Sequence, residues 1–216
     1  MSLELYSFWR SSASYRVRIA LHLKSLPFVY HGVDLVKGAG EQWDPKYRAV
    51  NPQARVPTLV HNGLRITQSL AIIEYLDELH HQPALLPKDP EARARVRALS
   101  QIIACDIQPM QNTSTTRYLK ETLKLDDAAV GNWVKEWIRR GLDAFNALLE
   151  HDRQSGKFCH GDQPGMADCC LVPQMYAAER FGVDPAQYPR LTLIWENCNR
   201  MPAFAAAHPA KQIDAR

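Results

Sequence analysis

A run of hydroxyl side chains, Ser11, Ser12 and Ser14, stands between a short apolar segment and the first helical pattern of the sequence. Serines there can simply cap the helix. The same position also attracts an anion, because free N–H groups and the positive end of the helix dipole point toward it. A hydrogen bond to a charged group contributes about 1.5–3 kcal/mol, and one unit of thiol pKa corresponds to about 1.4 kcal/mol. One hydroxyl and the helix end could therefore stabilise a thiolate near neutral pH.

Two further motifs could bind an extended anionic ligand. Val56-Pro57 directly precedes a strand pattern, where a cis bond would turn the Val56 backbone outward to pair with a peptide, and a simple turn is the alternative. Gln68-Ser69 begins another helical pattern and is either a second cap or a site suited to a carboxylate. Together the three motifs describe a site for a small anionic thiol peptide, and glutathione is such a peptide.

The elements that would position these motifs alternate between strand and helix up to residue 80. Apolar spacing predicts a strand at 3–8, a helix at 11–23, a strand at 28–35, a short helix at 41–49, a hairpin at 58–66 and a helix at 69–79 that a serine caps. Asn62-Gly63 predicts a type I′ turn in the hairpin. The order β-α-β-α-β-β-α is that of a thioredoxin-like domain, in which the first two strands are parallel.

After residue 80 the pattern becomes helical. We expect a thioredoxin-like domain over 1–80, a linker over 81–89 that contains two prolines, and an all-helical domain over 90–216. Helices are predicted from Pro90, over 126–149, over 166–181 and over 191–201. The second of these would bury five residues: Trp133, Trp137, Leu142, Phe145 and Leu148.

Longer runs of the sequence resemble the zeta-class glutathione transferases. In the first domain the resemblance is carried by residues 8–21, 51–52, 56–59 and 68–76, and in the helical domain by residues 107–112, 166–168, 171–174 and 178–181. It extends over nearly the whole chain. It implies the glutathione transferase fold, an α/β N-terminal thioredoxin-like domain plus an all-α C-terminal domain.

The resemblance also implies a role for each site residue. Ser11 would stabilise the thiolate of glutathione, the cofactor, while Arg10 would assist catalysis and, with Arg180, bind the carboxylates of a diacid substrate. An arginine near a helix C-terminus is favourable without any ligand, so Arg180 could also be an ordinary surface residue. Gln42 would contact the glycyl end of glutathione, the Val56 backbone its cysteinyl part, and Gln68 with Ser69 its γ-glutamyl carboxylate. The other cofactor contacts would come from Ser12, Ala13, Ser14, Tyr15, Arg16, Gln108, Asn112, Thr113 and Ser114.

The best-known members of this family are maleylacetoacetate isomerases of tyrosine and phenylalanine breakdown. The implied reaction adds the thiolate to the cis double bond of maleylacetoacetate, lets the resulting single bond rotate, and expels the thiolate to leave fumarylacetoacetate. A maleylpyruvate isomerase, a general conjugating transferase and a non-catalytic glutathione-binding module remain alternatives. Tyr6, near the end of the first strand, could also replace Ser11 as the thiol-activating group, or could simply pack into the core.

The sequence departs from the family pattern in two places. Ala13 stands where the family usually has cysteine, so glutathione would supply the only sulfur at the motif. Gly165 stands where the family usually has threonine at the start of a helix, and glycine caps nearly as well.

Composition limits the other possibilities. The five cysteines form no Cys-x-x-Cys pair and the eight histidines form no metal-binding pattern, so we expect reduced thiols and no metal. The net charge of +3 is spread without a basic block, which does not favour nucleic acid. The sequence shows no signal peptide and no apolar run near 18 residues, so we expect a cytoplasmic protein without a membrane span. The family resemblance, together with an arginine-rich face of the helix from Pro90, favours a homodimer.

Overall fold

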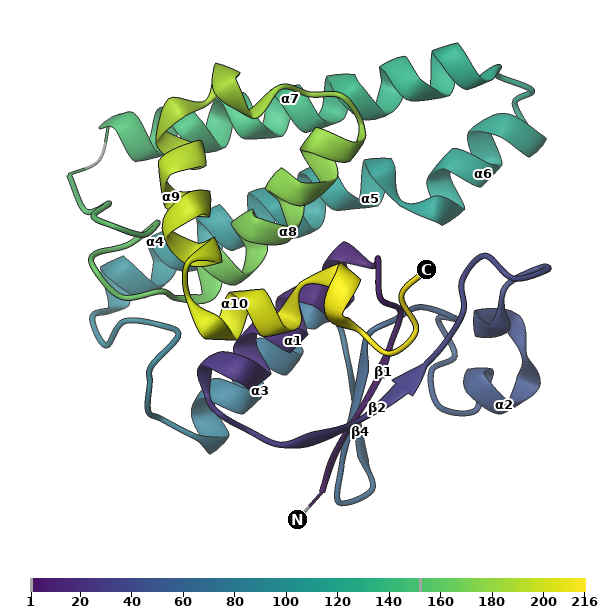
Figure 1. Cartoon of the computed structure of the whole chain (residues 1–216), viewed down its shortest axis with the longest axis horizontal. Coiled ribbons are helices and arrows are strands. Elements are labelled where there is room, and N and C mark those ends of the chain that lie inside the picture. Colours follow the sequence, from purple (N-terminus) through teal and green to yellow (C-terminus); the bar gives the residue numbers. More distant parts are fainter. Residues whose placement is uncertain (1, 152) are drawn as a thin grey trace. The chain divides into compact units, whose positions relative to one another are not determined.

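The computed structural model describes residues 2–151 and 153–216. The chain divides into two compact units, one formed by Met1–Leu86 with Arg200–Arg216 and the other by Pro87–Asn199 (Figure 1). The C-terminal segment therefore belongs to the first unit, where the sequence pattern had placed it in the helical domain. The reason is a packing contact that periodicity does not reveal: helix α10 (Pro202–Ala207) lies along helix α1 (Ser12–Leu23) (Figure 1).

The described strands of the first unit form one sheet in the order β2-β1-β3-β4. Strands β1 (Leu3–Ser7) and β2 (Phe28–Gly32) are parallel, as predicted, with Leu3 opposite Phe28. Strand β3 (Thr58–His61) runs antiparallel to β1 and forms a hairpin with β4 (Leu64–Thr67). Asn62 and Gly63 both have positive φ, 51° and 83°, which confirms the tight turn predicted from this pair.

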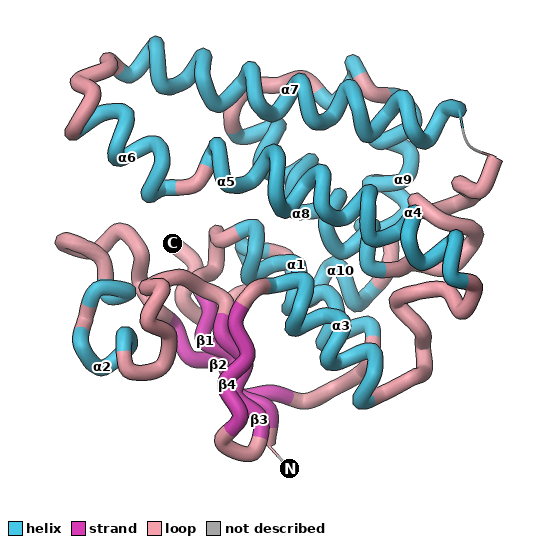
Figure 2. Tube along the Cα trace, turned by 180° about the vertical axis from the view of Figure 1, so that it is seen from behind, coloured by secondary structure: helices cyan, strands magenta, loops and turns pink. Residues whose placement is uncertain are grey.

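Helices cover both faces of this sheet (Figure 2). On one face α1 packs against α3 (Ser69–Leu79), and the core there includes Leu5, Ile19 and Ile72, all fully buried. On the other face the helix expected at 41–49 is divided into a 3₁₀ turn (Glu41–Trp43) and α2 (Pro45–Arg48). The thioredoxin-like order is confirmed.

The expected boundary at residue 80 also moves, because a buried ion pair holds the following loop. The Lys24 ammonium, at the end of α1, lies 2.8 Å from the Asp77 carboxylate and donates to the His80 and Pro83 carbonyls. Asp77 in turn accepts from the backbone N–H groups of Leu85 and Leu86. A buried ammonium needs such partners, and they tie the loop to the first unit.

The second unit is helical, as predicted. Its helices are α4 (Pro90–Gln101), a π-helical turn (Ile102–Ile107), α5 (Gln108–Gln111), α6 (Thr113–Glu121), α7 (Asp127–His151), α8 (Met166–Arg180), a 3₁₀ turn (Pro185–Gln187) and α9 (Pro189–Asn199). Pro109 explains the π turn, because proline has no N–H for the carbonyl one turn earlier and displaces that carbonyl. The predicted buried face of α7 is partly wrong. Leu142 and Phe145 are buried as predicted. Trp133 and Trp137 are only partly buried and Leu148 is 48% exposed, whereas Val134, Ile138 and Leu149 are buried.

Asp168 fixes the start of α8. Its side chain is 1% exposed and accepts from the N–H groups of Gly165, at 2.8 Å, and Cys159, at 2.9 Å. The carboxylate therefore binds the backbone N–H of the N-cap residue, as the acidic residue of a capping box does, and also holds the preceding loop.

Candidate active site

Ser11 is the N-cap of α1. Its backbone is extended, with φ −67° and ψ 119°, and its Oγ accepts from the N–H of Ser14 at 3.2 Å. The Ser11 N–H itself donates to the Phe8 carbonyl at 3.0 Å, which closes the turn between β1 and α1. A serine hydroxyl has two lone pairs and one proton. Capping uses one lone pair and leaves the proton to donate, so a capping role and a thiolate-binding role are compatible.

The rest of the motif is divided between surface and core. Ser12 and Ala13 are partly exposed, whereas Ser14, Tyr15 and Arg16 are buried. The Arg16 guanidinium is 2% exposed and its Nη1 donates to Ser69 Oγ at 3.1 Å. This bond joins α1 to the first residue of α3, so two of the motifs predicted from sequence lie next to each other.

The N-terminus of α3 is built differently from the expectation. The predicted serine cap is wrong: Gln68 is the N-cap, no side chain caps the helix, and Ser69 is its first residue. Gln68 has φ 69° and its amide donates to Gln53 Oε1 at 2.9 Å. An uncapped helix N-terminus above a buried guanidinium attracts an anion. A non-glycine residue at positive φ is a strained conformation that occurs often at ligand sites.

Gln42 lies in the 3₁₀ turn that precedes α2 and is buried. Its side chain is 7% exposed, and its Oε1 has no hydrogen-bond partner among residues 2–151 and 153–216. Gly40 makes room for it, because a Cβ at that position would lie 2.4 Å from the Gln42 amide. Gly40 also has φ 101°, which other residues rarely adopt. A buried amide with an unused polar atom is suited to a polar ligand.

The Val56-Pro57 bond is cis, as the sequence analysis allowed. Val56 is 8% exposed and packs with Phe8, Val33 and Tyr47. The loop that leads to it is held by Tyr47, whose hydroxyl donates to the Arg55 carbonyl, and by Asn51, whose amide donates to the same carbonyl at 2.7 Å. Sequence reasoning missed both supporting roles; the pair Asn51-Pro52 was the available signal for Asn51.

Tyr6 lies among aromatic rings. It is stacked on His31, with ring centroids 4.7 Å apart, and lies 5.8 Å from Tyr47. It also packs against the cluster that contains Phe8. This packing supports the core role for Tyr6 that the sequence analysis kept as the alternative to thiol activation.

The remaining predicted residues belong to the second unit. Asn112 is the N-cap of α6 and accepts from the Ser114 N–H at 3.0 Å, while Gln108 begins α5 directly after the π turn and Thr113 is exposed. Arg180 is exposed in the last turn of α8, with its guanidinium 5.3 Å from the Phe181 ring centroid. Each is thus placed on a helix end or turn.

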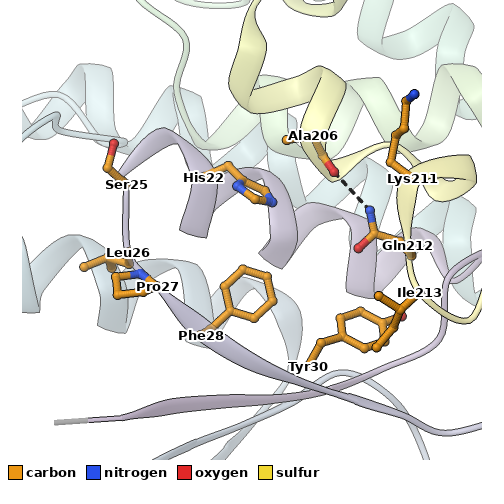
Figure 3. A pocket seen from close by; sticks show the side chains of 10 residues that line it. All are labelled: His22, Ser25, Leu26, Pro27, Phe28, Tyr30, Ala206, Lys211, Gln212 and Ile213. Atoms are coloured by element: carbon orange, nitrogen blue, oxygen red, sulfur yellow. Dashed lines mark hydrogen bonds between the residues drawn. The ribbon is translucent and has the colours of Figure 1, made fainter.

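A separate pocket of about 630 Å³ lies in the first unit (Figure 3). Its lining includes His22, Phe28, Tyr30, Lys211 and Gln212, and contains no residue predicted for the glutathione site. Burial, and to a lesser extent the Arg18 charge, lowers the pKa of His22, which disfavours its charged form.

Two further properties concern the part of the chain that the structure describes. The described residues contain no cluster of His, Cys, Asp and Glu able to hold a metal ion. Over the same residues, no helix has the length and apolar character that a membrane crossing requires.

Comparison with known proteins places this geometry in a class. Residues 5–84 match the family described as "Glutathione S-transferase, N-terminal domain". The chain is 45% identical over 213 residues to a maleylpyruvate isomerase of Ralstonia sp, covering 99% of this chain and 100% of that protein. It is also 45% identical to the maleylacetoacetate isomerase of Pseudomonas aeruginosa, covering 98% of each.

Solved structures agree. The holo structure of a maleylpyruvate isomerase, described as a bacterial glutathione transferase of the zeta class, superposes with a TM-score of 0.95 at 45% identity, covering 99% of this chain and 100% of that one. The maleylacetoacetate isomerase of Anaeromyxobacter dehalogenans, solved with GSH in its active site, gives a TM-score of 0.88 at 44% identity, covering 100% and 98%. The fold is thus that of a glutathione transferase. Within that class, the chain belongs to the zeta-class glutathione transferase and maleylacetoacetate isomerase family of enzymes.

Proposed function

We propose that this protein is a glutathione-dependent cis-trans isomerase that converts maleylacetoacetate to fumarylacetoacetate. The observation that carries the proposal is the buried Arg16–Ser69 hydrogen bond, which joins the N-termini of α1 and α3. A ligand that carries both a thiol and a carboxylate is suited to two adjacent helix N-termini. Relatives that are 44–45% identical over nearly the whole chain carry the names of isomerases, and one was solved with GSH bound.

The residues present fit glutathione. The uncapped α3 N-terminus above Arg16 suits the γ-glutamyl carboxylate, with Gln68 and Ser69 as its contacts. The buried Gln42 amide suits the glycyl end, and the Val56 backbone suits the cysteinyl part. We further propose cofactor contacts from Ser12, Ala13, Ser14, Tyr15, Gln108, Asn112, Thr113 and Ser114.

Bound glutathione supplies a thiolate that adds reversibly to the cis double bond, which then rotates as a single bond. Ser11 donates its hydroxyl proton toward the sulfur, and the α1 dipole adds to this stabilisation. Ala13 offers no competing thiol at the motif, and burial raises the pKa of both Cys159 and Cys198. Arg10 and Arg180 are proposed to bind the substrate carboxylates. The Arg10 guanidinium lies 5.3 Å from the centroid of the Trp9 ring, which restricts its orientation.

Maleylpyruvate is the second candidate substrate, and the relative from Ralstonia sp supports it. The decisive experiment measures isomerisation of maleylacetoacetate and maleylpyruvate by purified protein, with and without glutathione. Turnover of neither diacid, combined with rapid conjugation of chlorodinitrobenzene, would favour a general transferase. Binding of glutathione without any turnover would favour a non-catalytic module.

We also propose that the protein is a cytoplasmic homodimer. All five cysteines are free thiols, which is consistent with a reducing compartment. Leu64 on β4 and Leu79 on α3 are 53% and 42% exposed, and an isologous interface would cover such side chains. Arg93 and Arg95, on the arginine-rich face of α4, donate to the Pro87 and Cys159 carbonyls of the same chain.

A further inference from the structure

The C-terminal tail ends beside the loop that leads to Ser11. The Asp214 carboxylate accepts from the Trp9 N–H at 3.1 Å through Oδ2 and from the Tyr30 hydroxyl at 2.7 Å through Oδ1. Figure 3 shows Tyr30 and Ile213 together at one end of the pocket, and the bond from the Gln212 amide to the Ala206 carbonyl that holds the tail against α10. A contact between residues 9 and 214 joins the far ends of the sequence at the motif.

Arg18 holds the same loop from inside. Its side chain is fully buried, and its Nη2 donates to the Trp9 carbonyl at 2.8 Å while its Nη1 donates to Ser7 Oγ and the Phe8 carbonyl. Its Nε donates to the Ala207 carbonyl at 3.0 Å, which ties α10 to α1. Both backbone polar groups of Trp9 are therefore bound by charged side chains. Such charge-assisted bonds are roughly twice as strong as neutral ones.

Trp9 is two residues before Ser11, and the turn between them is closed by the bond from the Ser11 N–H to the Phe8 carbonyl. A shift of the Trp9 peptide therefore moves the Ser11 hydroxyl. It also moves Arg10, whose guanidinium lies over the Trp9 ring. A displacement of about 1 Å in a reacting group can reduce a rate about 100-fold, so the anchor on Trp9 bears directly on catalysis.

We propose that Asp214 is a positioning residue for the catalytic loop: by holding the Trp9 N–H it fixes the place of the Ser11 hydroxyl. The inference rests on the proposed role of Ser11 toward glutathione. The chain itself supplies a matched control, because Arg216 ion-pairs with Asp34 and so anchors the same tail without contacting the loop.

The test measures the pKa of the thiol of bound glutathione, from the ultraviolet absorbance of the thiolate, in four proteins. Asp214→Ala removes both contacts, so we expect that pKa to rise by about 0.5–1 unit and kcat/KM to fall about tenfold. The Kd for glutathione, measured at a pH where the bound thiol is protonated in all four proteins, should change less than about twofold. Asp214→Asn keeps an oxygen for the Trp9 N–H and an amide that can donate to the Tyr30 oxygen. It should therefore restore most of both values, and Arg216→Ala should behave like the wild type.

Hydrogen exchange of the Trp9 amide gives a second readout, and it should be faster in Asp214→Ala alone. Should that variant fail to fold, Tyr30→Phe replaces it, with a smaller rise in the thiol pKa expected. The inference is overturned if Asp214→Ala leaves the thiol pKa unchanged, or if Arg216→Ala raises it equally. A wild-type protein that leaves the thiol pKa of glutathione unperturbed overturns both this inference and the proposed role of Ser11. If the expected pKa pattern appears without any isomerase turnover, the proposed function alone is wrong.

Discussion

Replacing Ser11 with alanine tests the chemistry most directly. The Ser11 Oγ caps α1, with the Ser14 N–H at 3.2 Å, and its proton is the proposed donor to the sulfur. Loss of one donor to a developing anion typically costs about 10²–10³ in rate. We therefore expect kcat/KM for the isomerisation to fall about 10²–10³-fold. At about 1.4 kcal/mol per factor of ten, this is about 3–4 kcal/mol of transition-state stabilisation.

The same substitution also removes the cap, which costs about 1 kcal/mol of folding free energy. Activity should therefore be measured well below the melting temperature, with circular dichroism on the same samples. The pH dependence of kcat/KM gives an independent check, because a thiol that has lost its donor titrates at higher pH. Tyr6→Phe is the control and should remain near the wild type, since Tyr6 packs against His31 and Tyr47. If Tyr6→Phe loses the activity and Ser11→Ala keeps it, the assignment of Ser11 is refuted.

Three further outcomes are expected. Removing glutathione by gel filtration should abolish isomerisation and adding it back should restore it; full turnover without it would exclude the mechanism. Asp168→Ala leaves the buried N–H of Cys159 and the partly buried N–H of Gly165 without their acceptor, so urea unfolding should show a loss of about 2–4 kcal/mol. The exposed cap Asp126, whose carboxylate accepts from the Ala129 N–H, is the control, and Asp126→Ala should cost about 1 kcal/mol. Equal losses would show that burial of the Asp168 cap is unimportant. Light scattering at micromolar concentration should give twice the mass of one chain, and a single-chain mass would rule out the dimer.

The part of the first unit that precedes residue 80 was predictable because its elements are short and bounded by strong local signals. Asn62-Gly63 specified the hairpin turn, and Gln68-Ser69 marked the start of α3. The details of the α3 cap were not predictable, because Ser69 is used by Arg16 from another helix. Capping preferences describe local chain geometry only, whereas here a tertiary contact decides which oxygen is available.

The buried face of α7 shows a different limit. Periodicity placed Trp133 and Leu148 inside because large apolar residues recur there. Leu142 and Phe145 are buried as predicted, but the rest of the buried face is formed by smaller aliphatic residues such as Val134, Ile138 and Leu149. Trp133 is only partly buried, and its indole N–H donates to the Met110 carbonyl at 3.0 Å. A tryptophan needs a partner for this N–H, and periodicity does not register that requirement. The packing of residues 200–216 on the first unit was missed for a related reason. A helical pattern shows which face of a helix is apolar, but it does not show which part of the protein that face packs against.

The pair Arg16 and Arg18 connects these observations. Residues two apart on a helix point in nearly opposite directions, about 200° around its axis. Arg16 therefore reaches α3 and the proposed carboxylate site, while Arg18 reaches the loop before Ser11 and the carbonyl of Ala207. Burial lowers the pKa of Arg18 to about 10, which still leaves it charged at neutral pH. Two guanidinium groups inside a small domain are costly to desolvate, and burying apolar residues in their place would hold α1 at least as well. Their positions are explained if both ends of the proposed ligand site must be held in place. One arginine holds each end, from opposite sides of α1, the helix that Ser11 caps.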